Sequence, residues 1–269
     1  MSKRLIALGQ IFPFSVFRFV VRRLIRWRRE KKYRLQRKRL EARYFSVPRP
    51  RDVAVGSRSL GDLPIVVINL PERSDRLRQF TDEMGKLGVT NFEVIPGVSG
   101  KALYPKLPGD FSGAIGCNLA HSTAVESPDW SKTDVLMVCE DDLEFLVSSS
   151  EIESLIANFL ARKDLDVLCL AGRVRGPKIP IDDELYVVTG LVGQACYLIK
   201  PHMAQPLADL WRSGVASLAR KRLSGKNDII WNSLQTRNAF FGYPTRQIAR
   251  QRESYSDIQG RVLPVQDST

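Results

Sequence analysis

A short apolar run that ends in three consecutive acids constrains the fold of this chain more than any other segment. Residues Val135–Phe145 read VLMVCEDDLEF, so five apolar residues run directly into Glu140, Asp141 and Asp142. An unbroken apolar run is typical of a strand buried on both faces, as in an α/β domain with a mostly parallel sheet. Carboxylates that follow such a strand lie at the carboxyl edge of the sheet, where α/β folds bind ligands.

The spacing of these acids indicates a cation site. On an extended backbone, the side chains of Glu140 and Asp142 share one face. Two carboxylates on one face suit a hard divalent cation, Mg²⁺ or Mn²⁺, that is bridged to phosphates. Acids in this place are also typical of an acidic loop or a helix N-terminus after a strand, and that end of a helix favours negative charge. The local sequence leaves both interpretations open.

The segment before the acidic run predicts a β-α-β unit. Leu63–Leu70 is a continuous apolar strand, and Phe92–Ile95 is a second strand. Between them, Glu72–Leu87 carries apolar residues at three- and four-residue spacing, which predicts an amphipathic helix. Pro71 suits the first turn of that helix, where its missing N–H is not needed, and Gly88 suits its end.

Further elements follow by the same reasoning. Apolar runs predict strands at Val167–Leu170, Tyr186–Val188 and Ala195–Ile199, and apolar periodicity predicts helices at Glu151–Arg162, Met203–Leu210 and Asp228–Leu234. Asp228, at the start of the last of these helices, suits either a cap or a catalytic role. The arginines of residues 246–252 suit either a diphosphate or a solvated edge.

Residues 113–121 read GAIGCNLAH, which is a glycine-spaced entry into a helix. Gly113 and Gly116 leave room for a phosphate to approach the backbone, although small-residue entries are common in helices without one. We interpret His121 as a hydrogen-bonded structural residue rather than a base.

Cysteine and histidine usage excludes several classes of site. The four cysteines are not in C-x-x-C spacing, and we expect them to be reduced thiols without a zinc site. They are Cys117, Cys139, Cys169 and Cys196. Only two histidines exist, which argues against a multi-histidine metal centre.

The net charge of +12 is concentrated at the N-terminus. Residues 1–51 hold 17 Lys and Arg against two acids, whereas the remainder holds 24 basic and 27 acidic residues. The apolar stretch Leu5–Val21 is interrupted and too short to span a membrane, and Arg22–Arg43 predicts a very basic helix. This combination suits an anionic membrane surface, contacted through residues 1–45. A solvated or disordered tail, nucleic-acid contact and an Arg-rich organelle-targeting peptide remain as alternatives.

Composition also predicts the domain organisation. Prolines and glycines near residues 48–61 mark a linker, so we expect a basic arm and linker at 1–61, a catalytic domain at 62–262 and a tail at 263–269. The near-neutral body argues against specific nucleic-acid binding.

Four separated segments, taken in order, resemble glycosyltransferase family 25, the lipopolysaccharide and lipooligosaccharide glycosyltransferases. An Asn-Leu-x-x-Arg-x-Asp-Arg opening, a Gly-x-x-Gly-Cys-x-Leu-x-His block, a Glu-Asp-Asp triplet after a strand and a late Ser-Asp-Ile are all present. The matching residues are Asn69, Leu70, Arg73, Asp75, Arg76, Gly113, Gly116, Cys117, Leu119, His121, Glu140, Asp141, Asp142 and Ser256–Ile258. A Gly-rich stretch with Gly190, Gly193 and Tyr197 adds to the resemblance, which covers about residues 63–260.

The chain departs from this pattern in four places. Pro71 and Glu72 replace the residues common after Asn-Leu, Ala120 replaces the Ser before His, and Gln194 stands where Thr is frequent. The acidic triplet is intact, and the basic arm lies outside the family pattern.

The resemblance implies a GT-A-like, nucleotide-binding α/β sandwich. It implies transfer of a sugar, often galactose, from a nucleotide-sugar donor such as a UDP-sugar to a saccharide or lipid-linked acceptor, with inversion. Glu140 and Asp142 would hold the Mn²⁺ or Mg²⁺ ion, and Asp228 or, second, Asp257 would be the general base. The donor would be bound by Asn69, Arg73, Asp75, Arg76, Gly113, Gly116, His121 and Asp141.

The sequence thus predicts a metal-dependent glycosyltransferase held by its arm on the cytoplasmic face of the bacterial inner membrane. Two alternatives belong to other classes of protein. One is a catalytically silent relative that binds saccharide or acts as a scaffold, and the other is a protein that binds nucleic acid through its arm.

Overall fold

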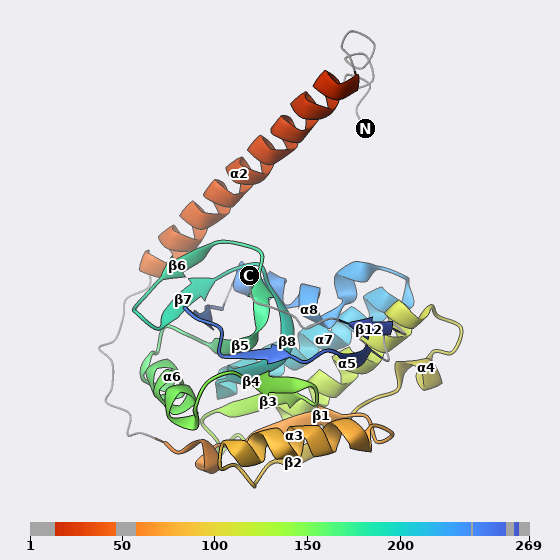
Figure 1. The fold of residues 1–269 in the computed structure, drawn as a ribbon, viewed down its shortest axis with the longest axis vertical. Helices are drawn as coiled ribbons and strands as arrows, with labels where there is room; N and C mark the ends of the chain where they lie inside the picture. Colours follow the sequence, from red (N-terminus) through yellow and green to blue (C-terminus); the bar gives the residue numbers. More distant parts are fainter. Residues whose placement is uncertain (1–13, 47–57, 238, 257–260, 264–269) are drawn as a thin grey trace.

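The computed structural model describes residues 14–46, 58–237, 239–256 and 261–263, and it describes side chains for 21–46, 58–237 and 239–253. A long helix, α2 (Phe14–Ser46), extends from an α/β body (Figure 1). Candidate base Asp257 lies outside the described residues.

An eight-stranded sheet forms the centre of the body, in the order β2-β1-β3-β8-β5-β9-β7-β6. Three of its pairs, β1–β2, β1–β3 and β5–β9, are parallel, and the other four are antiparallel. Followed across the sheet, these pairings reverse only β8 and β7, so six of the eight strands run in one direction. The strands are β1 (Ile65–Asn69), β2 (Glu93–Pro96), β3 (Leu136–Glu140), β5 (Val167–Val174), β6 (Lys178–Pro180), β7 (Leu185–Val188), β8 (Leu191–Ile199) and β9 (Phe241–Pro244). The predicted α/β class with a mostly parallel sheet is confirmed.

The remaining elements surround this sheet. Two small antiparallel sheets pair β4 (Leu143–Phe145) with β10 (Ala249–Gln251) and β11 (Ser254–Ser256) with β12 (Arg261–Leu263). The helices of the body are α3 (Ser74–Lys86), α4 (Gly100–Leu103), α5 (Gly109–Glu126), α6 (Ser149–Ala161), α7 (Ala204–Ala219), α8 (Asn227–Ile230) and α9 (Asn232–Gln235), with 3₁₀ turns at Leu60–Asp62, Pro201–Met203 and Leu223–Gly225.

Strand β3 shows how the sheet is buried on both faces. Met137 and Cys139 belong to one apolar cluster, which α3 and α6 complete, whereas Leu136 and Val138 belong to a second cluster, which α5 and α7 complete. Successive side chains of a strand point to opposite faces, so a run that is apolar at every position needs helices on both sides. Because helices cover both faces of the sheet, the end of β3 lies in the middle of the body.

Several predicted boundaries are wrong. Helix α3 begins at Ser74 rather than Glu72, because a turn closed by the Arg73 N–H and the Leu70 carbonyl (2.8 Å) precedes it and holds Pro71. Residues 113–121 lie in the middle of α5 rather than at a helix entry. Strand β8 begins at Leu191 rather than at the predicted Ala195, so Gly193, whose φ of +87° suits glycine, lies inside it.

The predicted helix at Asp228–Leu234 is divided into α8 and α9. Trp231 lies at the division, fully buried, and its indole N–H donates to the Leu191 carbonyl (2.8 Å). Tertiary packing of this one side chain therefore overrides the local helical pattern.

The predicted basic helix is present as α2, but its two ends lie in different surroundings. Residues 22–39 are exposed, whereas Leu40 and Tyr44 are buried in the same cluster as α3 and α6. Arg43 also donates hydrogen bonds to the carbonyl oxygens of Gln235 (2.6 Å) and Ala239 (3.2 Å). The predicted domain boundaries stay a prediction, but the last turns of the arm helix contribute to the core of the body.

Within the described residues, no helix combines the length and the hydropathy that crossing a membrane requires.

Candidate functional site

A cavity of about 370 Å³ lies at the carboxyl ends of β1 and β3. This volume is in the usual range for small-molecule sites. Its acidic lining residues are Glu140, Asp141, Asp142 and Asp228, and its basic ones are Arg76, Lys101, Arg173 and Lys226. Four acidic and four basic side chains suit a ligand that combines anionic groups with a cation, because the basic side chains can bind the anionic groups and the acidic ones the cation.

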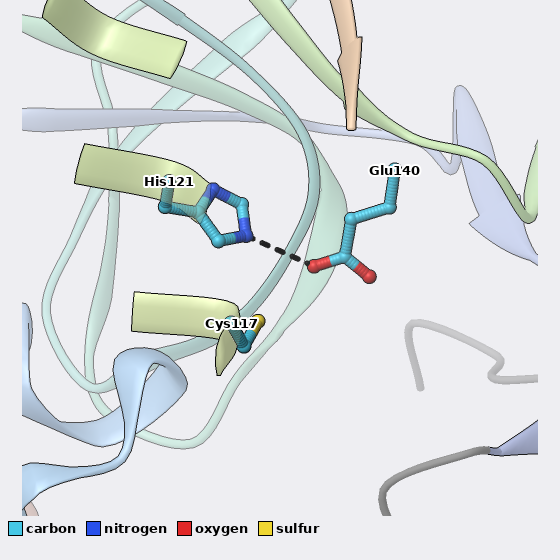
Figure 2. A group of neighbouring side chains, drawn as sticks. All are labelled: Cys117, His121 and Glu140. Carbon is cyan, nitrogen blue, oxygen red and sulfur yellow. Dashed lines mark hydrogen bonds and ion pairs between the residues drawn. The ribbon is translucent and has the colours of Figure 1, made fainter. Parts of the chain in front are cut away.

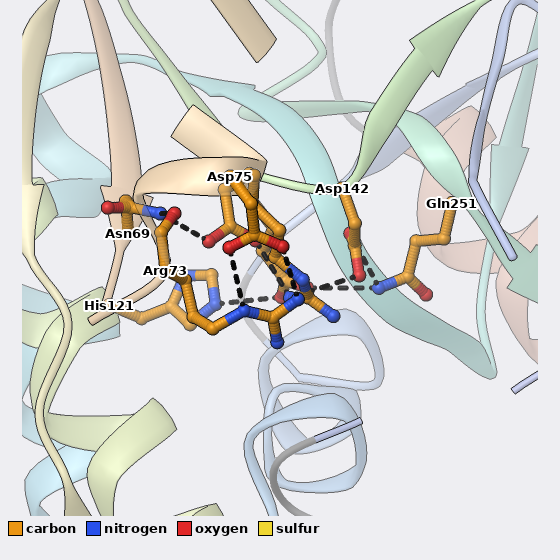
Figure 3. A network of polar contacts seen from close by, with 9 residues as sticks. Asn69, Arg73, Asp75, His121, Asp142 and Gln251 are labelled. Carbon is orange, nitrogen blue, oxygen red and sulfur yellow. Dashed lines mark hydrogen bonds and ion pairs between the residues drawn. The ribbon is translucent and has the colours of Figure 1, made fainter. Parts of the chain in front are cut away.

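Asp141 anchors the end of β3 to the end of β1 through Asn69, which is labelled in the polar network of Figure 3. Its carboxylate accepts hydrogen bonds from Asn69 Nδ2 (2.7 Å) and from Arg76 Nη1 (2.9 Å). The side chain is only 7% exposed, and this burial raises the pKa of Asp141, while the charge of Arg76 opposes the rise. Asn69 and Asp141 therefore hold the ends of β1 and β3 together, and Asp141 and Arg76 also line the cavity.

Glu140 ends β3 and Asp142 lies in the turn that follows, so the backbone between them is not extended as the sequence predicts, yet both carboxylates contact one side-chain amide. The side-chain amide of Gln251, on β10, donates from Nε2 to Glu140 Oε2 (3.0 Å) and to Asp142 Oδ1 (3.3 Å). The two carboxylates therefore face the same side-chain amide. Burial, and next the charge of Glu140, raise the pKa of Asp142 to about 7. A divalent cation fits this pair, because it would stabilise two neighbouring anions that are costly to bury alone.

His121, on α5, lies behind Glu140 and is fully buried. Its Nε2 is 3.2 Å from Glu140 Oε1, and its Nδ1 is 3.0 Å from the hydroxyl oxygen of Tyr197. Because an ionised carboxylate only accepts, Nε2 carries the proton, and in a neutral imidazole Nδ1 accepts from Tyr197. Both ring nitrogens are engaged, which agrees with the interpretation of His121 as a hydrogen-bonded structural residue.

Cys117 lies one turn before His121 on the same helix (Figure 2). Its Sγ, a ring nitrogen of His121 and a carboxylate oxygen of Glu140 all lie within 4.8 Å of one another, a geometry that can hold a metal ion. Asn227 Nδ2 donates to the sulfur (3.0 Å), and burial raises the pKa of the Cys117 thiol well above its usual value.

Gly116 serves a packing contact. A Cβ on Gly116 would overlap the carbonyl oxygen of Val98, and one on Gly100 would overlap that of Ser112. The two glycines let the 98–100 backbone lie directly against α5. Gly113 and Gly116 both line the cavity, so a ligand can still reach this face of α5.

Arg73 and Asp75 lie outside the cavity lining, although the Arg73 carbonyl oxygen accepts a hydrogen bond from Asn69 Nδ2 (3.0 Å). They pair with each other at the start of α3 (Nε to Oδ1, 3.0 Å), with the Asp75 side chain 53% exposed. The hydrogen bond from Arg73 lowers the pKa of Asp75 to about 2. Arg76 lines the cavity, whereas neither Arg73 nor Asp75 belongs to the described lining.

Asp228, the predicted base, lines the cavity from α8. Burial raises its pKa, and the charge of Lys226 opposes the rise. A cavity carboxyl group whose pKa is raised is better suited to accept a proton than one with an ordinary pKa. The second candidate, Asp257, is outside the described residues.

The arginines of residues 246–252 form ion pairs with acids of the body. Arg246 lies 2.6 Å from Glu151, and Arg250 lies 2.7 Å from Glu144. Arg252 lies 3.4 Å from Glu83. These pairs favour the edge interpretation over a diphosphate site.

Sequence reasoning missed Gln251, Asn227 and Gln194 as parts of the site. Gln194 is buried, donates to the Asn227 carbonyl (3.1 Å) and accepts from Asn227 Nδ2 (3.0 Å), which fixes the start of α8. Long-range contacts bring these amides together, so no local signal marks them. Cys117 and His121 did have a signal, because a four-residue spacing on a helix places two side chains on one face.

Comparison with known proteins gives likeness in structure only. No protein-family model matches the chain, and no curated protein matches its sequence. The structure "A197 from STIV" is 12% identical, with 76% of this chain and 94% of that chain covered, at a TM-score of 0.39. Mannose-1-phosphate geranyltransferase from Thermus thermophilus is 12% identical over 73% of this chain and 76% of its own, at 0.36. Mouse xyloside xylosyltransferase 1 is 10% identical over 66% of this chain and 83% of its own, at 0.38.

At these identities and TM-scores, the likeness does not assign an activity. The resemblance to glycosyltransferase family 25 therefore stays a sequence-based prediction.

Proposed function

We propose that the protein is a metal-dependent glycosyltransferase that moves a sugar from a nucleotide-sugar donor to a saccharide acceptor. One observation carries the proposal: Glu140 and Asp142 converge at the carboxyl end of a central strand, inside a cavity of mixed charge. A nucleoside diphosphate with a divalent cation has the charges that this cavity complements.

Glu140 and Asp142 would hold the cation, with their hard oxygen donors suited to Mn²⁺ or Mg²⁺. Such an ion, when bound, neutralises the charge that develops on the departing diphosphate. Asp141 and Asn69 keep the two ligand-bearing residues in place by fixing the backbone between them. Arg76 and Lys226 line the same cavity and would bind phosphate oxygens.

Asp228 would take the proton from the attacking acceptor hydroxyl, which would give an inverting transfer. Its place in the cavity lining and its raised pKa support this role. Asp257 remains the second candidate, on the family resemblance alone. The same resemblance supports galactose as the sugar and lipopolysaccharide or another surface glycan as the product.

The exposed part of α2 would hold the enzyme on an anionic membrane surface, on the cytoplasmic face of the bacterial inner membrane, near a lipid-linked acceptor. Eleven Lys and Arg against one Glu occupy residues 21–39, and Leu24, Ile25 and Trp27 are 44–50% exposed among them. Apolar side chains with surrounding cations are typical of interfacial helices.

Mn²⁺-dependent hydrolysis of a panel of nucleotide sugars tests the enzyme activity. We expect one donor to be hydrolysed and Asp142→Ala to lower the rate by at least about 100-fold, the loss typical of a removed electrostatic stabiliser. Asp209→Ala, an exposed carboxylate on α7, is the matched control and should keep the wild-type rate.

Calorimetry with UDP and Mn²⁺ distinguishes the failures of that assay. Binding without hydrolysis would mean that the acceptor is required. Absence of both binding and hydrolysis in folded protein would refute the transferase and support a catalytically silent relative.

Vesicles test the arm separately. Replacement of Arg22, Arg23, Arg28 and Arg39 by Gln should weaken binding to vesicles with anionic lipid by about 100-fold or more, since each cation near the surface contributes about 1 kcal/mol. Donor hydrolysis without vesicles should not change. Equal binding of both proteins to anionic and neutral vesicles would refute the membrane role.

A further inference from the structure

The two oxygens of the Glu140 carboxylate face different groups. Oε2 accepts from Gln251, on the side that Asp142 shares, whereas Oε1 lies 3.2 Å from His121 Nε2. Cys117 lies on the His121 side (Figure 2). The mechanism proposed above uses the Oε2 side and gives no role to the sulfur or the imidazole.

Three different donor atoms converge on the Oε1 side. Cys117 and His121 are four residues apart on α5 and share one helix face, and Glu140 comes from the end of β3. Their ligand atoms all lie within 4.8 Å of one another. The three residues also line the cavity, so an ion and a further ligand can enter from that side.

Outer contacts hold the sulfur and the imidazole in orientation. The hydroxyl of Tyr197, itself fully buried, lies 3.0 Å from His121 Nδ1. The amide of Asn227 donates to Cys117 Sγ at 3.0 Å, and Gln194 in turn fixes that amide. Metal-binding histidines are oriented through their second ring nitrogen in this way, and such outer partners raise metal affinity.

We propose that Cys117, His121 and Glu140 form a three-ligand site for Zn²⁺ or a similar transition ion, with its fourth position open to the cavity. A thiolate, an imidazole and a carboxylate are the ligands that zinc takes in proteins, whereas Mg²⁺ and Mn²⁺ prefer oxygen alone. On binding, the Cys117 thiol proton leaves to solvent. The imidazole changes tautomer, so that its proton is on Nδ1 and the Nδ1–H donates a hydrogen bond to the Tyr197 oxygen.

This site revises the sequence-based expectation of no zinc site, which rested on the missing C-x-x-C spacing. It does not depend on the proposed transferase, because only Glu140 is common to both sets of ligands. The hard-cation pair retains Asp142, and the new site retains the sulfur and the imidazole.

Cobalt absorption tests the sulfur ligand directly. Titration of the full chain with Co²⁺ should produce a sulfur-to-cobalt charge-transfer band, which Cys117→Ser abolishes. Cys196→Ala should keep the band, because that thiol is buried in the sheet, and Asp142→Asn should keep it while donor hydrolysis falls. No band in the wild type, or a band that survives Cys117→Ser, would overturn the site.

The affinity for Zn²⁺ measures how much Cys117 contributes to metal binding. Competition against a chelator should show Zn²⁺ binding weakened by more than about 100-fold in Cys117→Ser, since even outer-shell changes cost about 10- to 100-fold. Equal affinities of variant and wild type would refute the site.

Thiol protection keeps the test valid if Cys117→Ser does not fold. In the wild type, Cys117 is the half-buried cysteine and the other three are buried. Zn²⁺ should slow its alkylation by at least about tenfold, as read by mass spectrometry of the peptide that contains it, because a bound thiolate is not free to react. Mg²⁺ should not. An alkylation rate that Zn²⁺ leaves unchanged would overturn the proposal.

Discussion

The cavity and the exposed part of α2 use charged residues in opposite ways. Residues 21–39 of α2 carry the greatest density of charge in the described chain, and nearly all of their side chains are in solvent. The Arg26–Glu30 pair there is 83% and 51% exposed. In the cavity, the Arg76–Asp141 pair is 13% and 7% exposed.

The comparison shows that burial, rather than the number of charges, decides how much a charged residue contributes to the stability of the fold. A solvated pair contributes about 0–1 kcal/mol, whereas removal of one partner from a buried pair costs about 3–5 kcal/mol. The arm can therefore change its charges without loss of the fold. The few charges of the cavity are structurally coupled to the ends of β1 and β3.

The largest effect on stability is expected from Arg76→Met. It leaves Asp141 and Asp142 without the cation that both approach, at 2.9 and 3.7 Å. Loss of a buried partner should lower the free energy of unfolding by about 3 kcal/mol, as measured by urea denaturation at pH 7. Arg26→Met, the exposed counterpart on α2, should change it by less than about 0.5 kcal/mol. Similar losses in both variants would remove the contrast between the two regions.

The next largest effect on stability distinguishes the two ends of α2. Leu40 is 3% exposed and Leu24 is 44% exposed on the same helix. Leu40→Ala should destabilise the protein by about 2–3 kcal/mol, because it leaves a cavity in the core. Leu24→Ala should change stability by less than about 0.5 kcal/mol. If both variants unfold as the wild type does, the end of the arm helix is not part of the core.

The smallest effect depends on pH. The pKa of Asp142 is about 7 in the folded protein, above the ordinary value of about 4 for Asp. The folded state therefore retains this proton after the unfolded state has lost it, so stability falls as pH rises from about 4 to about 7. Asp142→Asn, which stays neutral, should be more stable than the wild type by about 1–2 kcal/mol at pH 8 and nearly equal at pH 4, in buffer with a chelator.

Asp75→Asn is the control of opposite sign. The pKa of Asp75 is lowered to about 2 by Arg73, so its contribution to stability is present above the ordinary Asp value and is lost as pH falls through about 2. This variant should be less stable than the wild type at neutral pH. A gain in stability at pH 8 in both variants would show that burial of Asp142 is not the cause.

Residues with a regular pattern were predicted well. The spacing of apolar and charged residues along the chain predicts three elements: the strand β3, the β-α-β unit from Leu63 to Ile95 and the basic helix. The apolar run also correctly indicates that β3 ends at the acids, whereas the cation-binding role of Glu140 and Asp142 stays a prediction. The division between α8 and α9 was not found, because the burial of Trp231 causes it.

The sequence alone is enough to predict the class of the fold, the central strand, the acids at its end and a basic N-terminal helix. These depend on hydrophobic periodicity and on charge, which act between neighbours along the chain. Only the tertiary structure decided that Gln251 lies between two carboxylates, that Tyr197 orients His121 and that Leu40 joins the core. Each of these contacts joins residues more than 70 positions apart or depends on packing between layers, and no local pattern encodes which distant side chain will fill a given space.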